Sequence, residues 1–142
     1  MKTKALTIVL ILITTISCKN ETKTEAMSGV DNLELTLNNG EKWIANVETD
    51  KGVKSMDSII AVFKKEKDKD YNTLGENLSK QTSYIIKNCT MEGESHDQLH
   101  VVLVPMLDEI SALKESNNTA NPEASLVNLE QLIDAYFSHF KL

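Results

Sequence analysis

Hydrophobic residues recur at intervals of three and four along four stretches of the chain, which is the spacing of one face of an α-helix. The four stretches cover residues 49 to 69, 71 to 89, 95 to 113 and 122 to 140. Their apolar positions include Val53, Met56, Ile60, Leu74, Leu78, Ile85, Leu99, Leu103, Met106, Ile110, Leu126, Leu129 and Ile133. Because short connections join the stretches, neighbouring helices must run antiparallel. The sequence therefore predicts an all-α fold, an up-down-up-down four-helix bundle.

Residues typical of helix ends support these limits. Asp70 precedes the second stretch as an N-cap, and Ser95, with a glutamine three residues later, has the pattern of a capping box. Asn121 precedes Pro122, and proline is favoured in a first helical turn because its missing amide hydrogen has no helical partner there. Pro105 lies inside the third stretch, where we expect a bend in one helix instead of two separate helices.

A different pattern precedes the first helix. Apolar and polar residues alternate at positions 33 to 37 and again at 43 to 47, on either side of Asn38-Asn39-Gly40. Alternation predicts strands with one buried face, and an Asn-Gly pair favours a tight turn. The sequence therefore predicts a short β-hairpin at the beginning of the bundle domain, which we place at residues 32 to 142.

Residues 1 to 17 have the pattern of a secretory signal peptide. Lys2 and Lys4 precede an apolar run that is shorter than the about 20 residues of a membrane-spanning helix, and Ser17 stands just before Cys18. The segment resembles the signal sequences of bacterial lipoproteins, which implies cleavage before Cys18 and lipidation of that residue. The alternative is an ordinary cleaved signal peptide that leaves Cys18 as a spare thiol.

The segment from residue 18 to 31 is polar and is predicted to be a flexible tether that follows the lipidated cysteine. We therefore expect a protein of the cell envelope that is attached to a membrane by lipid. The expected place is the outer membrane, on the side that faces the periplasm.

Composition excludes several classes of function. The chain has 142 residues, of which 15 are basic and 21 are acidic, and every basic residue is lysine. A net charge of -6 argues against a nucleic-acid partner, because such proteins neutralise phosphates with basic patches. The lack of arginine and of a glycine-rich phosphate loop argues against phosphoryl transfer.

The segment between the second and third helices offers candidate metal ligands. Cys89, Met91, His96 and His100 supply a thiolate, a thioether and two imidazoles. His96 and His100 are four residues apart, so they share one helix face at a spacing that suits two ligands of one metal. A mixed set of sulfur and imidazole ligands favours copper, with zinc as the alternative.

The predicted topology adds two candidates. In an antiparallel bundle, the beginning of the first helix and the end of the fourth meet this segment at one end, so Met56 and His139 are additional candidate ligands. Each candidate also has an ordinary structural role. Methionine and free cysteine are commonly buried packing residues, and histidine near a helix terminus is commonly exposed.

Two segments carry a further resemblance. KWIAN at residues 42 to 46 and CTMEGESHDQLH at residues 89 to 100 resemble segments of small, uncharacterised helical-bundle lipoproteins of Gram-negative bacteria. The resemblance implies the fold and the anchoring, and it implies no catalytic function.

Several functional hypotheses follow. The first is a membrane-anchored, non-catalytic lipoprotein that binds or sequesters copper. The alternative is a protein-interaction or structural module without any metal. Haem held between Met56 and His100 is a third hypothesis, although the chain has no Cys-x-x-Cys-His attachment motif. Catalysis by Cys89 and His96 as nucleophile and base is least favoured, because no third orienting residue can be identified, and we expect no enzymatic activity.

Overall fold

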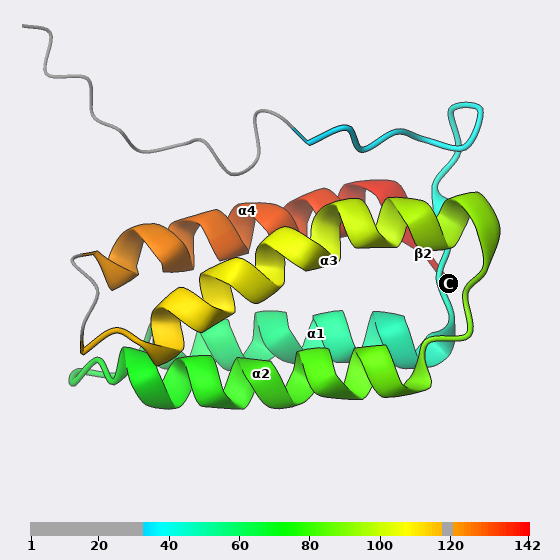
Figure 1. Cartoon of the computed structure of the whole chain (residues 1–142). Helices are drawn as coiled ribbons and strands as arrows, with labels where there is room; N and C mark the ends of the chain where they lie inside the picture. The colour runs from blue at the N-terminus through cyan, green and yellow to red at the C-terminus, as the bar shows by residue number, and fades with distance from the viewer. Residues whose placement is uncertain (1–32, 118–120) are drawn as a thin grey trace, which may run out of the picture.

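Four antiparallel helices form the body of the molecule, a computed structural model that describes residues 33–117 and 121–142. The helices are α1 (Val47–Phe63), α2 (Tyr71–Asn88), α3 (Gly93–Lys114) and α4 (Pro122–His139). Successive helices reverse direction and pack against each other, with α1 and α2 in one layer and α3 and α4 in the other (Figure 1). The predicted all-α four-helix bundle is confirmed. The expected signal peptide, Cys18 and the tether lie outside the described residues.

The predicted caps form at two of the helices. The Asp70 carboxylate accepts hydrogen bonds from the Thr73 amide, at 2.9 Å, and from the Thr73 hydroxyl. Both bonds lower the pKa of Asp70. Asn121 accepts one from the Ala124 amide at 3.2 Å, with Pro122 in the first turn. These side chains satisfy amide groups that have no partner within the helix.

Helix α3 begins two residues earlier than expected, at Gly93, so the capping box predicted at Ser95 is wrong. The Ser95 hydroxyl donates instead to the backbone oxygen of Glu92 at 3.0 Å. Gly93, the first residue of the helix, has a positive φ of 61°, which glycine adopts without steric cost because it has no side chain. The helix then continues through Pro105 to Lys114, as one helix instead of two.

Helix α1 is shorter than predicted and ends at Phe63 instead of near Lys69. The residues from 64 to 70 are all exposed and offer no apolar side chain that further helical turns could bury. The Lys69 ammonium donates to the Phe63 backbone oxygen at 2.6 Å and lies 4.8 Å from the centre of the Phe63 ring. This lysine therefore satisfies a carbonyl at the helix end.

The predicted β-hairpin is wrong beyond its turn. Asn39 and Gly40 both have positive φ, and a single antiparallel bridge joins Asn38 to Glu41. The chain then pairs elsewhere, because β1 (Trp43–Ile44) lies parallel to β2 (Phe140–Lys141), which follows α4 directly. This pairing lies at the end of the bundle, where Trp43 and Phe140 are both buried in the hydrophobic core.

Buried apolar side chains from all four helices form one core. The largest fully buried side chains are Met56, Ile60, Leu78, Ile85, Leu99, Met106, Leu113, Leu129, Leu132, Ile133 and Tyr136. Gly52 lets α1 approach α2 closely, because a side-chain carbon at this position would collide with Ile85. No helix in the described part of the chain is long and apolar enough to cross a membrane.

Candidate metal centre

The connection between α2 and α3 brings Cys89 and His96 together. Cys89 follows the last residue of α2, and its amide still donates to the Ile85 backbone oxygen at 2.8 Å. Only four residues separate the two helices, and Gly93 then begins α3 in the opposite direction. His96 lies in the first turn of α3, so the corner places its imidazole beside the thiol.

The Sγ atom of Cys89 lies 3.6 Å from Nδ1 of His96. Two ligands of a tetrahedral metal, at metal–sulfur and metal–nitrogen distances of about 2.3 and 2.0 Å, lie roughly 3.5 Å apart. A linear arrangement of the same ligands would separate them by about 4.3 Å. The observed spacing therefore suits a weak S–H···N hydrogen bond and also a metal ion shared at a bent angle.

His100 lies beside this pair. Its ring centre is 4.3 Å from that of His96, with an angle of 61° between the two ring planes. Cys89 and His96 are half-buried and His100 is exposed. The three side chains line a hollow of about 230 Å³ together with Ile85, Ile86, Leu99 and Leu103. The hollow is thus lined by four aliphatic side chains, one thiol and two imidazoles.

The other candidate ligands lie elsewhere. Met91 is half-buried and packs against the hydrophobic core. Met56 is fully buried within α1, and Nδ1 of His139 lies 2.8 Å from the Ala135 backbone oxygen. None of these three residues is among those that line the hollow. The structure therefore brings together three of the four principal candidates, and it does not bring Met56 and His139 to them.

Within residues 33–117 and 121–142, no group of three or more histidine, cysteine, aspartate and glutamate side chains is already arranged to hold a metal. Sγ of Cys89 and Nδ1 of His96 lie within contact distance, and the His100 ring packs against that of His96. His100 is exposed, and exposed side chains change rotamer on the picosecond to nanosecond timescale. No family model, no curated protein and no solved structure matches the chain. Function is therefore inferred from these residues and their geometry.

Behind the corner, polar side chains tie the beginning of α1 to the end of α2. The Asn46 amide donates to the Asn88 backbone oxygen at 3.0 Å, and the Thr49 hydroxyl donates to Oδ1 of Asn46 at 2.5 Å. Asp50 is buried and pairs with Lys54 at 2.7 Å. Of these contacts, the bond between Asn46 and Asn88 joins the beginning of α1 to the α2 terminus from which Cys89 extends. No sequence pattern indicates this network, although Asn46 lies in the KWIAN segment.

Tyr136 of α4 places a hydroxyl in the same end of the bundle. The side chain is fully buried and stacks on Phe140 with ring centres 4.9 Å apart. Among the described residues, its hydroxyl has no hydrogen-bond partner. Burial, followed by electrostatic interactions with Asp50 and Cys89, raises the pKa of Tyr136 well above its usual value. The hydroxyl is therefore protonated at physiological pH.

Tyr136→Phe is expected to leave the free energy of unfolding unchanged or to raise it by up to about 1 kcal/mol, because an unpartnered buried hydroxyl lowers stability and the ring stacking remains. Urea unfolding of the purified protein measures the change. Tyr71→Phe is a suitable control. It should lower the free energy of unfolding, because the Tyr71 hydroxyl donates to Glu123 at 3.2 Å. A decrease of more than about 1 kcal/mol in the free energy of unfolding of Tyr136→Phe would mean that the hydroxyl has a partner, such as an ordered water.

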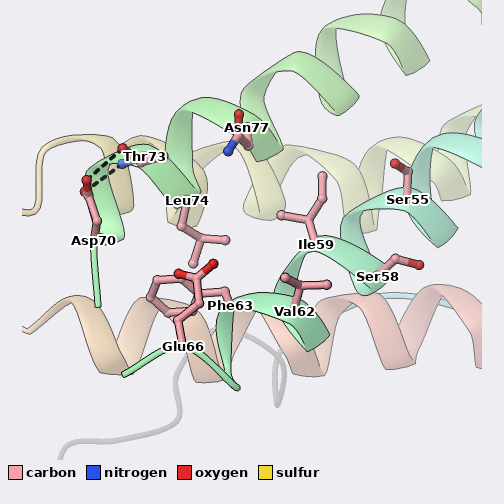
Figure 2. Close-up of a pocket in the computed structure, with 10 residues that line it drawn as sticks. All are labelled: Ser55, Ser58, Ile59, Val62, Phe63, Glu66, Asp70, Thr73, Leu74 and Asn77. Atoms are coloured by element: carbon pink, nitrogen blue, oxygen red, sulfur yellow. Dashed lines mark hydrogen bonds between the residues drawn. The ribbon is translucent and has the colours of Figure 1, made fainter. Parts of the chain in front are cut away.

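A second hollow lies at the opposite end of the bundle, between the end of α1 and the beginning of α2. Its volume is about 350 Å³. Figure 2 shows Ile59, Val62, Phe63 and Leu74 gathered in it, with Glu66 at one edge. Val62 is 60% exposed, so this groove presents apolar surface to solvent. It offers none of the sulfur or imidazole ligands of the corner.

Proposed function

We propose that this protein is a lipid-anchored, non-catalytic lipoprotein of the cell envelope that binds a soft metal ion at the corner between α2 and α3. Copper is the first choice and zinc the alternative, because thiolate and imidazole ligands suit both and soft ligands favour Cu(I). The observation that carries the proposal is the 3.6 Å distance between Sγ of Cys89 and Nδ1 of His96. His100, one turn further along α3, supplies the third ligand after a change of rotamer.

Met91 remains the proposed fourth and weakest ligand. It belongs to the four-residue connection that begins at Cys89 and does not line the hollow, so the connection must rearrange before its thioether can bind there. A neutral thioether contributes less binding energy than a thiolate, and its packing against the core must be lost first.

Binding is proposed instead of catalysis because of the contacts of His96. Within the described residues, its only side-chain hydrogen bond is to Cys89. A cysteine nucleophile with a histidine base needs a third group that orients the imidazole, and also donors that stabilise an oxyanion. A binding site for a soft metal ion needs neither of these, because it requires only ligand atoms of suitable chemistry and access for the ion.

Metal analysis of the full-length protein tests the proposal. The protein is purified from membranes without chelators, beside a Cys89→Ser variant prepared in the same way. The proposal requires close to one copper or zinc ion per chain in the wild type and a clear loss in the variant. Equal metal content in the two proteins would contradict it.

Cys18→Ser is expected to move the protein from the membrane fraction to the soluble fraction, because it removes the sulfur that carries the lipid. Fractionation and incorporation of a labelled fatty acid measure the effect. Cys89→Ser is the matched control and should remain membrane-bound, since it changes the other cysteine. If Cys18→Ser still sediments with membranes and the wild type incorporates no label, the anchoring proposal is wrong.

The groove between α1 and α2 favours the second candidate function, an interaction module without metal. An exposed apolar groove with polar edges is typical of protein-binding surfaces. The metal analysis separates the two candidates. Protein that is free of metal, and that also takes up no Cu(I) when it is supplied, would make the interaction module the leading hypothesis.

A further inference from the structure

The composition of the hollow bears on the charge of the metal ion that it accepts. Its walls are the side chains of Ile85, Ile86, Leu99 and Leu103, and Leu99 and Ile85 are almost completely buried. Its donors are one thiol and two imidazoles. None of the residues that line the hollow carries a carboxylate. Once Cys89 has lost its proton, the donors therefore carry a single negative charge.

Acidic side chains do occur nearby in the sequence, but they face water. Glu92, Glu94 and Asp97 are exposed, and none of them lines the hollow. Charges that are separated by water interact weakly, so these residues attract cations to the corner without neutralising a charge inside it. Compensation for the bound ion must come from the thiolate.

We infer that this hollow selects a monovalent soft cation, Cu(I) or Ag(I), over divalent zinc. The inference rests on the proposed function and specifies the ion that the same site takes. On binding, the Cys89 thiol releases its proton, a bond forms between Sγ and the metal, and no oxidation state changes. A monovalent ion replaces one proton, so the complex stays neutral, whereas zinc leaves one positive charge against apolar walls.

An uncompensated charge in apolar surroundings is costly unless a second charge pairs with it. Zinc sites commonly have four ligands and the hollow is lined by three potential ligands, so zinc would need a water molecule or another group as its fourth ligand. A carboxylate at the mouth of the hollow would supply both the missing negative charge and this fourth ligand.

Ile86→Glu supplies that carboxylate. Ile86 lines the hollow and is 59% exposed, so a glutamate can reach the mouth without burial of its backbone or stem. Ile86→Gln has the same shape without the charge. Val104→Glu is the second control, because Val104 is 51% exposed on α3 and does not line the hollow.

The experiment measures the dissociation constants of Ag(I) and Zn(II) for the full-length protein and these three variants, by competition with chelators. Ag(I) is the probe because it is soft, monovalent and resistant to oxidation in air. Ile86→Glu should raise zinc affinity about tenfold and change silver affinity less than about threefold. Ile86→Gln and Val104→Glu should leave the ratio of the two affinities as in the wild type. Circular dichroism establishes that each variant is folded.

An unchanged ratio in Ile86→Glu, or an equal change in Ile86→Gln, would overturn the inference about charge while metal binding itself remains established. Wild-type protein that binds zinc more tightly than silver would overturn it as well. If the wild type binds neither ion, the proposed function fails, and the inference that rests on it fails too.

Discussion

Leu103→Asp is expected to unfold the bundle, whereas Val104→Asp, one residue later on the same helix, is expected to leave it folded. Leu103 is 5% exposed and Val104 is 51% exposed. An unpaired carboxylate in the core costs several kcal/mol, which is on the order of the whole stability of a small domain. The same carboxylate on the outer face of α3 stays in water and is expected to change stability by less than about 1 kcal/mol.

Thermal unfolding followed by circular dichroism measures the difference between these two variants. The wild type and Val104→Asp should show cooperative loss of helix, and Leu103→Asp should lack a cooperative transition. A transition in Leu103→Asp within about 1 kcal/mol of the wild type would mean that the inward face of α3 is assigned wrongly.

Cys89→Ser is expected to lower the affinity for Cu(I) by at least about 100-fold, since loss of a group that merely supports a ligand already costs 10–100-fold. A hydroxyl is a hard, neutral group and cannot replace the thiolate. Met91→Leu should lower the affinity less than about fivefold, because a neutral thioether contributes weakly. His139→Ala is the control, since Nδ1 of His139 already contacts the Ala135 backbone oxygen outside the hollow.

Competition with a chromogenic Cu(I) chelator, under reducing conditions, gives these affinities. Equal values for the wild type and Cys89→Ser would return Cys89 and His96 to the role of packing residues at a helix corner. If His139→Ala lowers the affinity for Cu(I) more than Cys89→Ser does, the metal lies at a different part of the bundle end.

The helices could be predicted because their causes are local. Each helix has an apolar residue at every third or fourth position, and Asp70 and Asn121 mark two beginnings with side chains that satisfy backbone amides. The closeness of Cys89 and His96 could be predicted as well, because both flank a short connection between antiparallel helices. The distance between their side chains depends on the left-handed backbone at Gly93, which the sequence analysis did not use.

Contacts between distant parts of the chain were not predicted. The pairing of Trp43 with Phe140 depends on where the end of α4 arrives relative to the beginning of α1. No sequence pattern reveals that the buried hydroxyl of Tyr136 has no hydrogen-bond partner among the described residues. The hollow was also missed, although Ile86, an exposed apolar residue beside the buried Ile85, was a visible exception to the pattern of α2.

The X-ray absorption spectrum of the full-length protein loaded with one equivalent of Cu(I) tests the central claim most directly, because it reports the atoms bonded to the metal. The proposed site predicts one sulfur and two imidazole nitrogens in the first shell of a single copper, and loss of the sulfur in Cys89→Ser. A first shell without sulfur in the wild type, or a spectrum that Cys89→Ser leaves unchanged, would contradict a copper site at the corner of Cys89 and His96.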